Sequence, residues 1–201
     1  MDWNKLADDS VVESTAEALR KRGFEVIVVG NGEEAKKKVL ELVPEGAEVG
    51  AGSSTTLDEI GVTKEIDESG KYDSIRKRIR EISDEKERAA ARRKMIGPRY
   101  SMGSVQAITE DGQVVAASAT GSQLGYYVYG AEKLVLVAGT NKIVKNLDEA
   151  FKRIYEHALP LESERMRKAY GMGSSVNKIL VFERERPGRI TLILVKQKLG
   201  F

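Results

Sequence analysis

Hydrophobic positions alternate between helical and strand spacing along the first fifty residues. Between Asp9 and Arg22 they recur at helical spacing and stop at Gly23, which predicts a first helix. The β-branched run Phe24 to Val29 predicts a buried strand, Glu33 to Leu42 a second helix, and Ala47 to Gly50 a further short strand. This order of elements favours right-handed crossovers and a parallel sheet.

The segment from Ser104 to Lys145 contains the densest pattern of the chain. An Asp111-Gly112 pair predicts a hairpin between its first two strands, because Asp-Gly suits the positive φ angles of a primed turn. A short helix holding Leu124 to Val128 is expected after the Thr120-Gly121-Ser122 loop. The strands are expected over residues 105–109, 114–118 and 134–138. The loops of such a segment should gather at one edge of the sheet, where α/β folds usually bind ligands.

Residues 62–98 have a different character, with many charges around a narrow apolar stripe. Tyr72 to Ile96 is expected to form one long helix or two, with Met95 on the stripe. Between Arg76 and Lys94 there are nine Lys or Arg and four Asp or Glu residues, so this part carries +5 and the remainder −3. It is either an electropositive wall or docking face, or a solvated helix with ordinary intrahelical ion pairs.

The last third of the chain is expected to add a helix and two strands. Leu147 to His157 has amphipathic helical spacing. The apolar runs Ile179 to Phe182 and Ile190 to Val195 flank Pro187-Gly188 and are predicted to form a terminal antiparallel hairpin. The predicted fold class is therefore α/β, with a mainly parallel sheet flanked by helices, a helical insertion at 62–98 and a C-terminal β-hairpin. Residues 1–201 are expected to form a single domain.

Composition narrows the function classes. The 201 residues are 41% hydrophobic and 32% charged, and the net charge of +2 gives no global field for nucleic acid. The absence of cysteine excludes disulfides, a thiolate nucleophile and an iron–sulfur site within this chain, and favours a cytoplasmic location. A single histidine, His157, makes a zinc site or a Ser-His-Asp triad difficult to assemble. Neither a leader sequence nor the ~20-residue apolar run of a membrane span is expected.

Two polar loops at predicted strand ends are candidate anion sites. The loop from Gly50 to Thr56 reads Gly-Ala-Gly-Ser-Ser-Thr-Thr, in which glycines let backbone N–H groups approach an anion and hydroxyls donate further bonds. Gly139 to Lys142 is the second loop, and Lys142 is placed to meet an anion. A structural alternative stays open, in which the hydroxyls cap a short helix and Gly50 and Gly52 serve tight packing.

Several stretches together resemble one known family, the LUD domain or lactate-utilisation LutC/YkgG-like family, over nearly the whole chain. These stretches are GSSTTLDEIG at 52–61, AITEDGQVV at 107–115, ATG at 119–121, VAGTNKIVKNLDEA at 137–150 and the ending PGRITLILVKQKLGF. The resemblance implies a fold similar to NagB, ribose-phosphate isomerase and CoA-transferases. Relatives with this fold bind sugar phosphates, CoA thioesters or folate at the strand edge.

The resemblance also implies site residues. Carried over by position, they are Gly52, Ser53, Ser54, Thr55, Glu59, Glu110, Asp111, Thr120, Gly121, Asn141 and Lys142. Two departures from the family pattern stand out: Gln106 occupies a position where many relatives have Asn, and residues 169–175 lack the cysteines that many relatives carry there. Any metal or redox role of that stretch is thus not expected here.

Three functions remain as alternatives. The leading one is a non-redox subunit or accessory of L-lactate oxidation to pyruvate, with a cleft for a small phosphate or carboxylate, no cofactor of its own, and any iron–sulfur cluster on partner subunits. The second is a small isomerase or transferase acting on a phosphorylated or CoA-linked metabolite, with Glu59 or Glu110 as general base. The third is an interaction module that uses the basic helix, and a homo-oligomer is compatible with all three.

Overall fold

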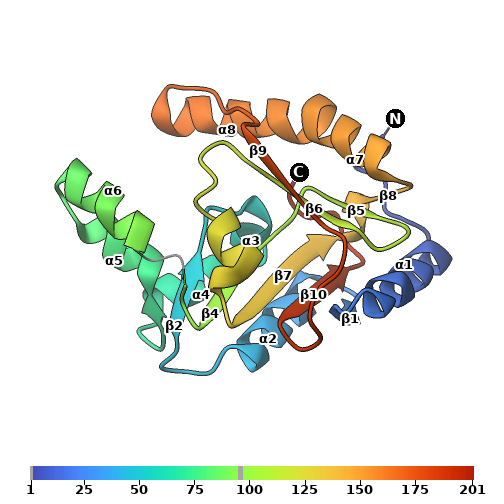
Figure 1. Ribbon diagram of the computed structural model, residues 1–201, viewed down its shortest axis with the longest axis horizontal. Helices are drawn as coiled ribbons and strands as arrows, with labels where there is room; N and C mark the ends of the chain where they lie inside the picture. The colour runs from blue at the N-terminus through green and yellow to red at the C-terminus, as the bar shows by residue number, and fades with distance from the viewer. Residues whose placement is uncertain (1, 95–96) are drawn as a thin grey trace.

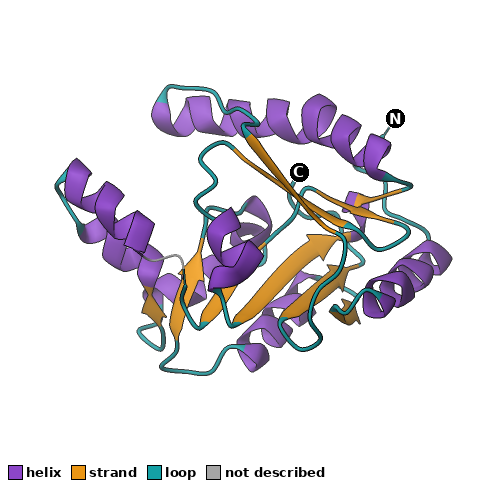
Figure 2. Cartoon of the chain, viewed as in Figure 1, coloured by secondary structure: helices purple, strands orange, loops and turns teal. Residues whose placement is uncertain are grey.

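A six-stranded sheet forms the centre of the computed structural model, which describes residues 2–94 and 97–201 (Figures 1 and 2). All of its paired strands run parallel, which confirms the predicted sheet. In spatial order the strands are β1 (Glu25–Val29), β10 (Ile190–Val195), β7 (Lys133–Gly139), β4 (Tyr100–Gly103), β2 (Glu48–Ala51) and β3 (Asp73–Ser74). The carboxyl ends of β7, β4 and β2 therefore lie side by side.

A smaller sheet packs against one face of the first. Its strands, in order, are β8 (Ile143–Val144), β5 (Ala107–Thr109), β6 (Val114–Ser118) and β9 (Lys178–Phe182). The antiparallel β5–β6 hairpin confirms a turn at Asp111-Gly112, and Gly112 has a positive φ of 91°. The primed geometry expected for the Asp-Gly pair is wrong, because Asp111 does not have a positive φ and the loop spans Glu110 to Gly112. The smaller sheet thus comes mainly from the segment with the densest sequence pattern.

The predicted C-terminal hairpin is wrong, because β9 and β10 belong to different sheets. β9 pairs with β6, whereas β10 inserts between β1 and β7 and runs parallel to both. The physical reason lies in the composition of β10, Ile-Thr-Leu-Ile-Leu-Val, which is apolar along nearly its whole length and almost fully buried. Such a run is typical of a central parallel strand with both faces covered, rather than of a hairpin with one wet face.

Three apolar clusters stack the molecule into layers (Figure 1). One face of the large sheet packs on α2 (Gly32–Leu42), α3 (Thr55–Glu59) and α4 (Val62–Glu68). Its other face packs on α1 (Asp9–Lys21) and the small sheet, as the burial of Leu19, Ile108 and Leu192 shows. The far side of the small sheet is covered by α7 (Leu147–Arg153) and a π-helical turn, Ile154–Ala158. α8 (Leu159–Tyr170) continues from that turn, so the helix predicted over 147–157 extends further.

The charged segment at 62–98 forms separate short helices, which confirms the two-helix alternative for the part after Tyr72. After α4 come α5 (Ile75–Glu81) and α6 (Glu85–Lys94), which extend from the body in Figure 1. The predicted positions Met95 and Ile96 lie outside the described residues. The α5 arginines are engaged, since Arg76 pairs with Asp67 at 2.6 Å and Arg78 with Glu48 at 2.6 Å. These pairs join α5 to α4 and β2, and the side chains of Arg76 and Asp67 are only 12% exposed, so they are not the intrahelical pairs of a solvated helix.

Two shorter elements differ from the sequence expectation. The helix expected from Leu124 begins at that residue, but it is π-helical over Tyr126–Gly130. The sequence pattern did not predict β4 at all. No helix in residues 2–94 or 97–201 has the length and apolar character needed to cross a membrane.

Candidate functional site

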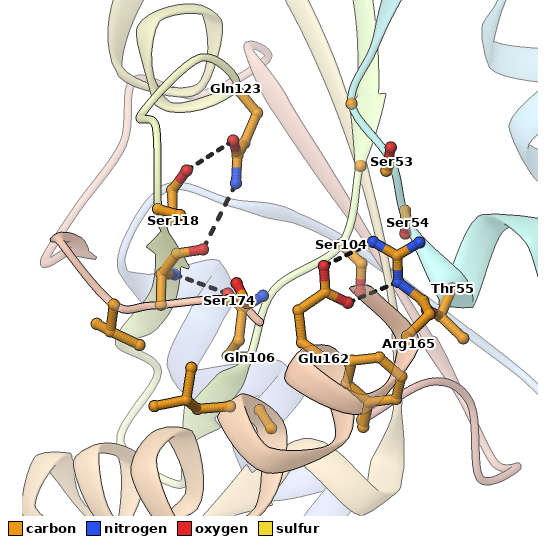
Figure 3. A pocket seen from close by; sticks show the side chains of 18 of the residues that line it. Ser53, Ser54, Thr55, Ser104, Gln106, Ser118, Gln123, Glu162, Arg165 and Ser174 are labelled. Carbon is orange, nitrogen blue, oxygen red and sulfur yellow. Dashed lines mark hydrogen bonds and ion pairs between the residues drawn. The ribbon is translucent and has the colours of Figure 1, made fainter. Parts of the chain in front are cut away.

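A cavity of about 290 Å³ opens where three neighbouring strands of the large sheet end. Residues that follow β2, β4 and β7 line it, and α8 contributes Glu162 and Arg165 to the lining (Figure 3). The central lining residues are Ser53, Ser54, Thr55, Thr56, Ser104 and Lys142. Because parallel strands end at the same edge, segments distant in the sequence converge here, as is usual for ligand sites in α/β folds.

Lys142 lies in the wall of this cavity, in the turn Thr140–Lys142 that follows β7. Its side chain is almost completely buried, and its Nζ donates to Thr56 Oγ1 and to Ser104 Oγ, both at 3.0 Å. Burial, with a further contribution from the charge of Arg153, lowers the pKa of Lys142 to about 7, while Glu59 acts in the opposite direction. A substantial fraction of this amine is therefore uncharged near neutral pH.

Arg153 is a second buried cation, at the end of α7. One Nη donates to the carbonyl oxygen of Gln106, whereas Nε and the other Nη have no hydrogen-bond partner within the described part of the chain. Burial lowers the pKa of Arg153 to about 10, so its guanidinium stays charged at neutral pH. The nearby His157 also has a lowered pKa, because of its burial and then the charge of Arg153.

Neither buried cation has a carboxylate within ion-pair distance among the described residues. Burying an unpaired charge costs several kcal/mol, so proteins usually pair such groups or neutralise them. Here Lys142 loses its charge, and Arg153 keeps donors that an anion or ordered water would satisfy. The cavity lining itself also includes two acidic residues, Asp58 and Glu162.

At the mouth of the cavity, an arginine forms an ion pair with a glutamate of the same helix. On α8, Arg165 donates to both carboxylate oxygens of Glu162, each at 2.7 Å. Figure 3 shows this pair beside the loop that carries Ser53, Ser54 and Thr55. Because both side chains are about one-third exposed, exchanging this intrahelical partner for a ligand is expected to cost little.

Amide and hydroxyl groups form the opposite wall. Gln106 lines the cavity, and its Oε1 accepts from the backbone N–H of Ala117 at 2.7 Å. The hydroxyl of Ser118 donates to Gln123 Oε1 at 2.9 Å, and both residues also line the cavity (Figure 3). The Gln106 side chain therefore reaches the site and is fixed to β6. In the described ranges no group of three or more Asp, Glu or His side chains could hold a metal ion.

The structure brings together most, though not all, of the residues predicted from sequence. Those lining the cavity are Gly52, Ser53, Ser54, Thr55, Thr56, Thr120 and Lys142. Gly50 is packed below it: a Cβ at this position would lie 2.7 Å from Pro98. Gly121 and Asn141 do not line the cavity. Gly121 lies in the turn beside it with a φ of 82°, and Asn141 Oδ1 accepts a hydrogen bond from the N–H of Leu199 at 3.2 Å.

The predicted acidic residues lie away from the cavity lining. Glu59 contacts the segment that follows β10: its Oε2 accepts a hydrogen bond from the N–H of Gly200 at 2.7 Å. Glu110 is exposed beside the β5–β6 turn, and Asp111 pairs with Arg22 at 3.3 Å. The structure thus gives Glu110 and Asp111 a place in the hairpin.

Sequence reasoning missed Ser104, Arg153, Glu162 and Arg165. Ser104 directly follows β4, so recognising that strand would have placed it at the sheet edge. Arg153 is an ordinary charged position on the predicted helix over 147–157, and no element was predicted around Arg165. Only the packing of α7 and α8 over the small sheet and the cavity distinguishes them.

Comparison with known proteins gives one family match. The LUD domain model matches residues 12–195. Among solved structures, a DUF162 family protein from Deinococcus radiodurans has a TM-score of 0.56 at 9% identity, covering 95% of this chain and 99% of that chain. Ribose 5-phosphate isomerase A from Neisseria gonorrhoeae has a TM-score of 0.40 at 15% identity, covering 80% and 91%. No curated protein matches the sequence.

Proposed function

The chain belongs to the LUD domain family, and on this premise we propose that its cavity binds a small carboxylate or phosphate in the service of L-lactate oxidation. In this proposal the chain acts as a non-redox subunit or accessory. Its 201 residues include no cysteine, so it has no thiolate ligands for an iron–sulfur cluster, which would belong to partner subunits.

One observation carries the binding proposal: the buried amine of Lys142, which has no carboxylate partner in the described ranges, lines the cavity, and the buried Arg153 lies behind the wall, where it donates to the lining residue Gln106. Lys142 contacts only hydroxyl oxygens through its Nζ, and Arg153 has two donors unused. An anion in the cavity would lower the electrostatic cost of both. The hydroxyls of Ser54, Thr56 and Ser104 supply neutral hydrogen-bonding groups around the same space.

Thermal unfolding with added anions tests this proposal. Sulfate, phosphate, L-lactate and pyruvate at about 10 mM should raise the midpoint, because a ligand with ~1 mM affinity adds roughly 1.4 kcal/mol of stability. Arg165→Gln should reduce the increase, since it removes the cation at the cavity mouth. Lys168→Gln is the matched control, because Lys168 pairs with Glu164 on the exposed part of the same helix. An increase that is equal in all three proteins would place the anion elsewhere, and no increase would contradict an anion site.

A second candidate is an isomerase or transferase acting on a small phosphorylated or CoA-linked metabolite. The observation in its favour is Lys142, whose amine is uncharged in part at neutral pH and lines the cavity. Glu110, by contrast, is exposed outside the lining. Exchange of substrate C–H protons in deuterated buffer tests this candidate: sugar phosphates should lose the proton next to the carbonyl with the native protein and keep it with Lys142→Met.

A further inference from the structure

We propose that the Lys142 amine forms a covalent imine with a small aldehyde or ketone that carries a carboxylate or phosphate and binds in the cavity. The inference rests on the proposed function, because the anionic group must be held there for the carbonyl carbon to meet the amine. It narrows the substrates to anions that also carry a carbonyl group, which simple anion binding does not require.

The surroundings of Lys142 favour a nucleophilic amine over a structural ammonium ion. An ammonium group offers three donors and is normally stabilised by a carboxylate. Lys142 Nζ instead has two hydroxyl partners, Thr56 and Ser104, and the Arg153 cation lies nearby. The backbone of Gly200 covers it from another side, since a Cβ there would lie 3.3 Å from Nζ. The amine is therefore buried, and it lies in the wall of the cavity in which a substrate would bind.

The charged groups around this amine are few and identifiable. Arg153 on α7 disfavours the protonated amine, and Glu59 on α3 favours it. His157, in the π-helical turn, has a lowered pKa and so adds little positive charge at neutral pH. In the absence of an anion, burial outweighs the effect of Glu59 and leaves a lone pair on Nζ at neutral pH. Because an anion next to Nζ would raise this pKa, imine formation requires the anionic group of the substrate to lie at the cavity mouth and only its carbonyl group to reach Nζ.

The two hydroxyls suit the proton transfers of imine formation. As Nζ attacks, a C–N bond forms and the carbonyl π electrons move to oxygen, which takes a proton lost by nitrogen. The C–O bond then breaks, a second nitrogen proton joins the departing oxygen as water, and a C=N bond remains. Ser104 Oγ and Thr56 Oγ1 lie 3.2 Å apart and both contact Nζ, so they can pass these protons. No oxidant or reductant takes part.

The remaining cavity wall suits the anionic end of such a substrate. Arg165 lines the mouth next to Ser53 and Ser54, and it is available once it leaves Glu162 (Figure 3). A carboxylate or phosphate at this mouth would direct the attached carbonyl toward Lys142. Short 2-oxo acids and aldehyde monophosphates share the needed chemistry, namely a carbonyl carbon close to an anionic group.

Reductive trapping tests the proposal on the full chain. The protein is incubated near neutral pH with pyruvate in one arm and glycolaldehyde phosphate in the other, cyanoborohydride is added, and labelled peptides are quantified by mass spectrometry. Lys142 should label on the order of a hundredfold faster than exposed lysines such as Lys145, because about half of the Lys142 amine is unprotonated at pH 7. Sulfate should compete, and the two arms show whether a carboxylate or a phosphate is preferred.

Controls separate the imine from the anion site. Lys142→Met should abolish the fast label, whereas Lys145→Met should retain it. Calorimetric titration of the same preparation with sulfate measures anion binding without a carbonyl. If sulfate binds and Lys142 labels no faster than exposed lysines, imine formation is refuted and the anion site stands. If neither sulfate binding nor fast labelling is observed, both proposals fail.

Discussion

Replacing Lys142 by methionine should stabilise the protein at neutral pH and lose this advantage at high pH. Methionine has a similar length and no charge, so it can occupy the buried path of the lysine side chain. Lys142 has a folded-state pKa of about 7 against an ordinary value of 10.5. The folded state therefore binds fewer protons than the unfolded state between these values, and the stability of the native protein rises with pH through this window.

The magnitude follows from the size of this difference. At pH 7 the lowered pKa costs the native protein roughly 4 kcal/mol, and at pH 10 it costs only about 1 kcal/mol. The variant avoids this cost but loses the hydrogen bonds from Nζ to Thr56 and Ser104, worth about 1 kcal/mol each. It should therefore be about 2 kcal/mol more stable at pH 7 and about 1 kcal/mol less stable at pH 10.

Urea unfolding of both proteins across this pH range measures the difference directly. Other titrating groups are common to both proteins and cancel in the comparison. Lys145→Met, at an exposed position three residues further on, should differ from the native protein by less than about 0.5 kcal/mol at every pH. A difference between Lys142→Met and the native protein that does not change from pH 7 to pH 10 would refute the lowered pKa, and with it the uncharged amine.

Two further substitutions test the packing around the site. Gly103→Ala should lower the free energy of unfolding in urea by about 1–3 kcal/mol, because the added methyl would overlap the Tyr127 hydroxyl. Gly173→Ala is the control and should cost clearly less, since its methyl would meet nothing closer than 3.6 Å. Equal costs of the two substitutions would contradict this reasoning. Ser54→Ala should cost about 1 kcal/mol, because Leu57 N–H loses its 3.3 Å cap bond, and should also weaken sulfate binding measured by calorimetry; unchanged affinity would remove Ser54 from the site.

Most of the correct fold predictions came from patterns of residues that are neighbours in the sequence. The Asp111-Gly112 turn, the Gly-Ser-Thr loop and the apolar run of β7 each depend on neighbours in sequence, and the structure contains all three. The parallel sheet followed from the alternation of helices and strands near the N-terminus. β4 was not predicted because Tyr-Ser-Met-Gly is short and mixed in polarity, and it is a strand only through pairing with β2 and β7.

The site was predicted only in part, because local patterns show which residues follow strands but not how distant segments pack. The loop at 52–56 and Lys142 were found because both follow strands, yet lysines in loops are usually solvated and nothing local indicated that this one is buried. Its burial depends on Thr56, Ser104 and Gly200, which come from three distant segments. The pairing of β9 with β6 likewise depends on long-range register, and the adjacency of β9 and β10 in sequence suggested the wrong partner.

The central claim is that an anion binds beside Lys142, and proton uptake on binding tests it most directly. Near pH 8 the free amine, with a pKa of about 7, is roughly nine-tenths unprotonated, and a bound anion that raises its pKa by ~1–2 units would draw in about 0.4 to 0.8 proton. Calorimetric titration with sulfate and with L-lactate, in two buffers of different ionisation enthalpy, measures this uptake. The account predicts such uptake in the native protein and none in Lys142→Met. Absence of binding, or binding with the same proton count in both proteins, would contradict it.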